Sequence, residues 1–215
     1  MVISAIVIVG YTSLGGFNAA STTDLIQSII MTIALLIVLV FGVSQAGGID
    51  AVMENARSIT GYLSLTECLN ADNTRVVSYS PLTIASTLAW GLGYFGMPHI
   101  LLRFMAIENP NKIKTSRRVA TIWVVISMAI AILIGVVGRG MIKNGAIEPL
   151  TTSSDSETII IEIAKLLSSY GVVPALIAGV ILAGILASTM STSDSQLLAA
   201  SSSACLLYTS PSPRD

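Results

Sequence analysis

The sequence predicts an all-α protein that crosses a membrane several times. Only 11% of its 215 residues are charged and 53% are hydrophobic, whereas about 25% of residues are charged in soluble domains. Asp, Glu, Lys and Arg do not occur in four long stretches, which are residues 25–49, 76–102, 119–138 and 166–193. Each stretch is long enough for a helix across the hydrocarbon core, which takes about 20 residues.

The apolar stretches indicate helices rather than the strands of a barrel. A bilayer admits only these two structures, because every backbone polar group needs a partner inside the protein. Barrel strands alternate apolar and polar residues, but residues 33–41 read Ile-Ala-Leu-Leu-Ile-Val-Leu-Val-Phe without alternation. We therefore predict five spans, at about 2–14, 24–47, 78–104, 118–139 and 169–194, the first of them partial.

The loop between the third and fourth predicted spans sets the orientation. Residues 103–118 carry five positive charges and one negative charge, whereas negative charges outnumber positive ones in 50–75 and 139–165. Short basic loops face the cytoplasm. The sequence thus predicts that Asp24, Arg103 and Asp194 all lie near the inner surface of the membrane.

The last eleven residues differ in character from those before them. The segment 205–215 contains two prolines in three positions and no apolar periodicity, so we expect it not to continue the preceding helix. It reads like translated adapter sequence, and we predict a non-native tail after a transmembrane domain at 1–204. The alternative is a disordered cytoplasmic tail. We expect the chain to be an internal fragment of a longer protein.

Charge, cysteine and histidine content argue against several functions. A net charge of −1 gives no basis for nucleic-acid binding. Cys68 and Cys205 lack metal-type spacing, and His99 is the only histidine. No serine elbow accompanies that histidine, and the two aspartates Asp24 and Asp194 lie at span edges. We therefore expect neither an enzyme nor a protein-bound cofactor.

The third predicted span contains a break. Between Trp90 and His99 the sequence reads Gly-Leu-Gly-Tyr-Phe-Gly-Met-Pro, with three glycines and a proline. Glycine weakens a helix interior, and proline removes a donor and clashes one turn back. An interrupted span points to a midplane substrate site. Trp90, Tyr94 and Pro98 share one face if the helix persists on both sides. The alternative is a proline-kinked helix packed with aromatic side chains.

The fifth predicted span carries a stripe of hydroxyl groups. Ser188, Ser191, Thr192 and Ser195 follow the spacing i, i+3, i+4 and i+7, which places them on one helix face. Such residues commonly serve close helix packing. The functional alternative is a site for a hard cation, which prefers oxygen ligands. Asp24 is a further candidate, for which a helix N-cap is the alternative role.

These motifs resemble the sodium/solute symporter family. The string from Trp90 to Ile100, followed by Arg103-Phe-Met-Ala, is similar to the seventh span of its proline-carrying bacterial members. The segment Tyr11-Thr-x-x-Gly-Gly-Phe, with Asp24 further on, is similar to the sixth. Met190-Ser-Thr, with Ser-Gln-Leu-Leu shortly after, is similar to the ninth. The resemblance covers residues 2–204.

The resemblance implies a fold and a function. The fold is ten core helices in two inverted five-helix repeats, of which this chain holds an internal part without the first core helix. The function is symport of L-proline with Na⁺, the coupling ion, across the bacterial cytoplasmic membrane. The implied residues are Trp90, Tyr94 and Pro98 for proline, Ser188, Ser191 and Thr192 for sodium, with Ser188 acting through its carbonyl, and Asp24 and Arg103 for coupling. The alternatives are a sensor domain of a membrane histidine kinase, or a family member that carries another small organic solute.

Overall fold

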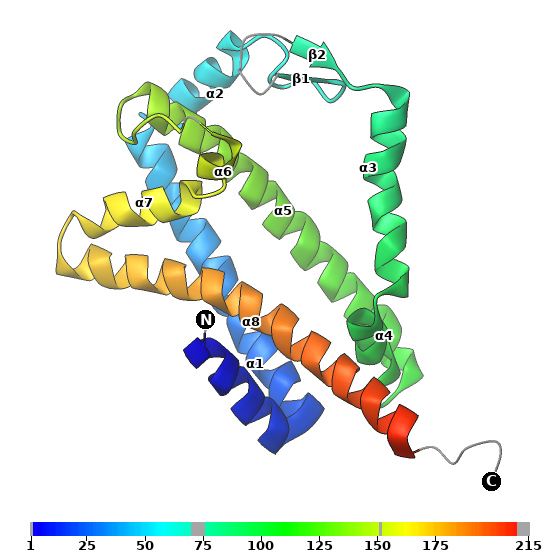
Figure 1. The fold of residues 1–215 in the computed structure, drawn as a ribbon. Coiled ribbons are helices and arrows are strands. Elements are labelled where there is room, and N and C mark those ends of the chain that lie inside the picture. Colours follow the sequence, from blue (N-terminus) through cyan, green and yellow to red (C-terminus); the bar gives the residue numbers. More distant parts are fainter. Residues whose placement is uncertain (1, 70–75, 151, 210–215) are drawn as a thin grey trace.

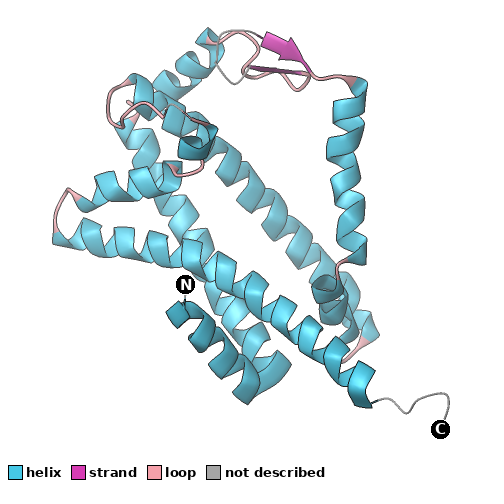
Figure 2. Ribbon diagram, in the orientation of Figure 1, coloured by secondary structure: helices cyan, strands magenta, loops and turns pink. Residues whose placement is uncertain are grey.

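The computed structural model describes residues 2–69, 76–150 and 152–209, and nearly all of its elements are helices (Figures 1 and 2). The long helices are α1 (Val2–Gln45), α5 (Ile113–Lys143) and α8 (Val172–Thr209). The shorter ones are α2 (Ile49–Ser58), α3 (Pro81–Gly93), α4 (Pro98–Met105), α6 (Ser153–Ser156) and α7 (Ile159–Ser168), with 3-10 turns η1 (Tyr94–Gly96) and η2 (Pro110–Lys112). One antiparallel hairpin pairs β1 (Glu67–Leu69) with β2 (Val76–Ser78).

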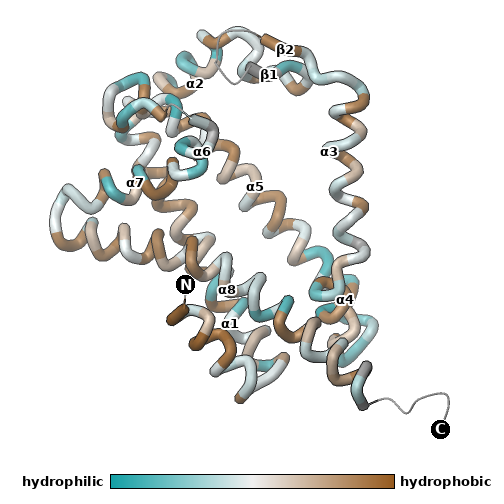
Figure 3. Tube along the Cα trace, viewed as in Figure 1, coloured by the Kyte–Doolittle hydropathy of each residue, from teal (hydrophilic) through white to brown (hydrophobic). Residues whose placement is uncertain are grey.

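Three helices of the described part of the chain are long and apolar enough to cross a membrane: α1, α5 with its leading 3-10 turn, and α8. Figure 3 shows hydrophobic residues along these helices and hydrophilic ones around α4. Large apolar side chains such as Leu36, Ile132 and Leu182 are exposed on them, which suits a hydrocarbon surrounding. The prediction of an all-α transmembrane chain is confirmed, apart from the short β-hairpin.

Helix α1 reverses direction at Gly16. This residue has φ 54° and ψ −142°, a combination that is essentially open to glycine alone. Figure 1 shows the segment before Gly16 folded back from the rest of α1. Ser4 and Ile8 of this segment line a groove against Leu186 and Met190 of α8. The predicted spans at 2–14 and 24–47 thus lie on the two arms of one bent helix.

The core forms where α1, α5, α7 and α8 meet. Its most buried large side chains are less than 2% exposed, and they are Val38, Ile134, Met141, Ile163 and Ile181. These residues come from four different helices, so the buried surface ties the long helices to one another. Packing of this kind is the main attraction between helices in lipid.

Glycines allow the long helices to approach closely. A Cβ atom on Gly184 of α8 would lie 3.2 Å from the Cβ of Ala34 in α1. A Cβ atom on Gly42 of α1 would lie 2.8 Å from a methyl group of Val137 in α5. Small residues serve the same purpose at many membrane helix crossings.

Different helices and loops gather at the two ends of the molecule. The bend of α1, the helix α4, the turn η2 and the end of α8 gather at one end, which we call the inner end because the basic loop 103–118 lies there (Figure 1). The helices α2 and α6 and the β-hairpin lie at the other. There the Asn144 amide donates to the Ala46 carbonyl at 2.6 Å, and Arg139 stacks on the ring of Tyr62. Burial raises the pKa of Tyr62, against an opposing effect of Arg139.

Helix α8 continues past the predicted start of the tail. It ends at Thr209, so the expectation that residue 205 begins a non-helical segment is wrong for 205–209. The physical reason is that the first proline comes only at Pro211. Residues 210–215 lie outside the described part of the chain, and the non-native origin of the segment stays a prediction.

Candidate functional site

The break in the third predicted span lies between α3 and α4. Helix α3 runs through Gly93, the turn η1 follows, and Met97 is extended with φ −75° and ψ 115°. Helix α4 then begins at Pro98. The cause is local, because the residue before a proline avoids the α conformation and the proline cannot donate to the preceding turn. The break therefore falls at Tyr94–Met97, whereas Gly91 and Gly93 remain helical.

The predicted substrate residues lie on both sides of this break. Trp90 and Tyr94 make an edge-to-face contact, with ring centroids 6.2 Å apart and planes at 73°. They are 74% and 52% exposed, so the aromatic pair is open on most of its surface. Pro98 is exposed at the first turn of α4. The pair and the interrupted backbone offer an apolar wall beside main-chain polar groups.

The predicted sodium residues lie on α8 but do not converge. The Thr192 hydroxyl donates to the Ser188 carbonyl at 3.3 Å, and both residues are exposed. Ser191 is half-buried and lines a wide opening together with Asp24 and Trp123. Because α3 has no buried residue, the structure does not pack the aromatic pair against these hydroxyl groups.

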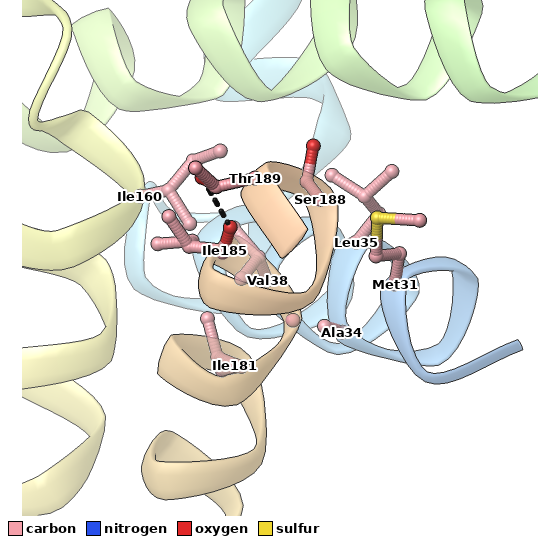
Figure 4. Close-up of a pocket in the computed structure, with 10 residues that line it drawn as sticks. Met31, Ala34, Leu35, Val38, Ile160, Ile181, Ile185, Ser188 and Thr189 are labelled. Atoms are coloured by element: carbon pink, nitrogen blue, oxygen red, sulfur yellow. Dashed lines mark hydrogen bonds between the residues drawn. The ribbon is translucent and has the colours of Figure 1, made fainter. Parts of the chain in front are cut away.

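Ser188 borders a different cavity, of about 310 Å³, between α1, α7 and α8 (Figure 4). The other lining residues are apolar apart from Thr189, whose hydroxyl donates to the Ile185 carbonyl at 3.3 Å. Figure 4 shows the Ser188 hydroxyl pointing away from Ile181. A cavity lined in this way lacks the oxygen ligands that a hard cation prefers.

The structure brings the predicted coupling residues together at the inner end. An amino group of Arg103 in α4 lies 2.5 Å from the Asp24 carboxylate in α1. The Arg103 side chain is 49% exposed and that of Asp24 12%. Asp24 lies eight residues after the bend at Gly16, inside a continuous helix. The N-cap interpretation of Asp24 is therefore wrong, because the helix has already begun.

Sequence reasoning missed two residues of this polar cluster. Asp194 is fully buried inside α8, and the hydroxyl of Tyr11 donates to it at 2.8 Å. Helix α8 runs on to Thr209, so Asp194, predicted at the inner edge of the span, lies inside a continuous helix. The available signal was a lone acid directly beside Ser195 on an otherwise uncharged span. Arg103 also contacts the Ser195 hydroxyl, at 2.6 Å.

Comparison with known proteins gives consistent results. Residues 1–213 match the profile of the Sodium:solute symporter family. The chain is 40% identical to the "Sodium/proline symporter" of Haemophilus influenzae over 200 residues, which cover 91% of this chain and 37% of that protein. It is 38% identical to the "High-affinity proline transporter PutP" of Bacillus subtilis over 198 residues, which cover 92% and 38%. It is 33% identical to the "Sodium/proline symporter" of Escherichia coli over 192 residues, which cover 89% and 36%.

These relatives are considerably longer than the chain. The chain spans little more than a third of their length. No solved structure matches it significantly.

Proposed function

The chain belongs to the sodium:solute symporter family, and we propose that it is part of a symporter that moves L-proline together with Na⁺ across a bacterial cytoplasmic membrane. The three relatives described above are named as proline transporters or symporters. Their names favour transport over catalysis, over a kinase-linked sensor role and over another solute. The expected partners are L-proline, sodium and the lipid bilayer.

The observation that carries this proposal is the interrupted helix beside an open aromatic pair. In the proposal, Trp90 and Tyr94 enclose the pyrrolidine ring of proline, while backbone groups around Pro98 receive its charged ends. Interrupted spans with free backbone groups are the usual place for a substrate in secondary transporters. The exposure of the pair in this chain agrees with a site whose other wall comes from elsewhere in the longer protein.

Sodium is proposed to bind at the hydroxyl groups of α8, on Ser191 and Thr192 with the Ser188 carbonyl nearby. Oxygen atoms of this kind suit a hard cation without placing a full negative charge in the membrane. Ser188 carries its role only through its carbonyl, because its hydroxyl borders an apolar cavity. Asp24 and Arg103 are proposed to couple the sodium site to the movement of the inner end.

The test is sodium-dependent proline uptake by the full-length protein that contains this chain. Trp90→Ala should weaken proline uptake at least about tenfold, and Thr192→Ala should raise the sodium requirement by a similar factor, since each removes a contact worth about 1.4 kcal/mol or more. The matched controls are Leu92→Ala, at an exposed residue of the same helix as Trp90, and Thr189→Ala, whose hydroxyl donates to the Ile185 carbonyl within α8. Uptake is normalised to the amount of protein in the membrane.

Two results would contradict the proposal. Proline uptake that does not depend on sodium would show that sodium is not the coupling ion. Proline uptake reduced equally by Trp90→Ala and Leu92→Ala would show a general effect of shortening an exposed side chain of α3, and would contradict the assigned substrate site.

A further inference from the structure

A groove of about 510 Å³ opens between α4 and the first turns of α5 at the inner end. Ile100 and Phe104 line it from α4, and Val124 and Val125 line it from α5. Arg117 lines the same groove closer to the start of α5. The groove therefore joins an apolar part to a cationic part.

The charges of α5 indicate how deep this groove lies in the membrane. Residues 119–138 contain no Asp, Glu, Lys or Arg, and a helix of about 20 residues spans about 30 Å, the thickness of the hydrocarbon core. Arg117 comes directly before this stretch, and Val124 and Val125 lie within it. Figure 3 likewise shows hydrophilic residues around α4 and hydrophobic ones further along α5. The groove thus runs from the level of the lipid headgroups into that of the acyl chains.

The positive charge beside the groove is not balanced within the described part of the chain. Two basic residues of the basic loop, Arg103 and Lys112, each pair with a carboxylate. The other three, Lys114, Arg117 and Arg118, are exposed and take part in none of the ion pairs of the described residues. Their spacing of i, i+3 and i+4 places them on one face of α5. An anion at this face would meet three unpaired cations.

The apolar part of the groove is open as well. Phe104 is 48% exposed and Val125 is 62% exposed, and α4 has no buried residue. A soluble anion such as phosphate or a nucleotide could pair with the cations, but it has no apolar part for these side chains. An anionic phospholipid has both a negative headgroup and acyl chains, in the order in which the groove presents its cationic and apolar parts.

We propose that the groove between α4 and α5 binds one anionic phospholipid of the inner leaflet. Arg117 contacts the phosphate, Lys114 and Arg118 add positive charge, and one acyl chain lies between Phe104 and Val124. Basic pockets between membrane helices on the cytoplasmic side bind lipid headgroups of this kind. The bound lipid fills the space between the segment that follows the break and the long helix α5.

The test compares the binding of two lipids to the full-length protein in detergent, without proline or sodium. Native mass spectrometry measures the Kd for dioleoyl phosphatidylglycerol, which is anionic, and for dioleoyl phosphatidylcholine, which is zwitterionic. The parent protein should bind phosphatidylglycerol at least about fivefold more tightly, because one basic residue beside an anionic lipid contributes about this factor.

Two variants separate the cationic part of the site from the apolar part. Arg117→Gln should weaken phosphatidylglycerol binding about fivefold and leave phosphatidylcholine binding nearly unchanged, because only the first lipid carries a net charge. Phe104→Ala should weaken the binding of both lipids about threefold, because it removes an apolar contact with acyl chains that both lipids have.

Each variant has a matched control. Lys112→Gln removes a basic residue of the same loop that is paired with Glu108 and does not line the groove. Met105→Ala shortens an apolar side chain of α4 that is 83% exposed and does not line the groove. Both controls should bind the two lipids with the affinity of the parent protein.

Three results would overturn the lipid site. They are equal affinity of the parent protein for the two lipids, an equal loss of phosphatidylglycerol binding in Arg117→Gln and Lys112→Gln, and displacement of phosphatidylglycerol by millimolar inorganic phosphate. The last result would show a site for a soluble anion. Lys114→Gln should weaken phosphatidylglycerol binding in the same direction as Arg117→Gln, which keeps the test decisive if Arg117→Gln does not reach the membrane.

The lipid measurement does not depend on which solute is carried. Selective phosphatidylglycerol binding by a protein that fails to take up proline would retain the lipid site and reject the substrate. Sodium-dependent proline uptake by a protein without this selectivity would retain the function and reject the lipid site.

Discussion

Helices α8 and α3 both carry proposed site residues, but the chain holds them in different ways. Helix α8 packs along α1 and α7, with Ile181 1% exposed and Gly184 set against Ala34. Helix α3 has no buried residue, and Trp90 is 74% exposed on it. Helix α8 is held by its neighbours within the chain. Helix α3 is held mainly by its own backbone and by its N-terminal cap, in which the Ser80 hydroxyl accepts from the Thr83 N–H at 3.1 Å.

This difference shows how a two-part site can be divided along a sequence. The hydroxyl groups of α8 are positioned by packing within the chain. The aromatic pair of Trp90 in α3 and Tyr94 in η1 is positioned only locally, through the contact between the two rings. Contact between the two halves passes through α4, whose Arg103 reaches both α1 and α8. Among the described residues, Arg103 thus links the segment that follows the break to α8 through a side-chain hydrogen bond.

The largest expected effect lies in the packed region. Ile134→Ala in α5 should lower the free energy of unfolding by about 2–5 kcal/mol, because it leaves a cavity in the core. Ile132→Ala, at a site that is 65% exposed against 1% for Ile134, should change it by less than about 0.5 kcal/mol. Thermal unfolding of the purified full-length protein in detergent measures both. An equal loss of unfolding free energy in the two variants would mean that Ile134 is not packed more closely than Ile132.

The crossing of α1 and α8 should show the next largest effect. Gly184→Leu should lower the free energy of unfolding by about 1–3 kcal/mol, because the added side chain meets Ala34 and overfills the helix crossing. Gly179→Leu, on the same helix with nothing within 4 Å of an added Cβ, is the matched control. The same unfolding measurement applies. A Gly184→Leu protein as stable as the control would mean that the two helices do not cross closely.

The smallest expected change in stability is in α3, where the substitution should stabilise the helix rather than destabilise it. Gly91→Ala should stabilise this helix by about 0.5–1 kcal/mol, because alanine loses less backbone entropy than glycine. No atom lies within 4 Å of an added Cβ there. Slower amide hydrogen exchange in residues 81–93 measures the gain. Faster exchange would show that the Gly91 face is closely packed in the longer protein. That result would contradict the contrast between an open α3 and a packed α8.

The local features of the molecule could be predicted from the sequence. Charge-free stretches are long because a bilayer excludes ionised groups, so the apolar helices follow from composition alone. The break follows from Pro98 and its effect on Met97. The contact of Trp90 with Tyr94 follows from their spacing of four residues. The end of α8 was misjudged, because the apolar residues 205–208 continue a helix that only Pro211 must end.

Only the tertiary structure decided the contacts at the inner end. Tyr11 and Asp194 are 183 residues apart in the sequence, and Arg103 is separated from Asp24 by 79 residues and from Ser195 by 92. These long-range contacts depend on the reversal of α1 at Gly16 and on the depth at which α1 and α8 cross. The chemistry of each side chain is set by the sequence, but the partner it finds is set by how closely whole helices pack.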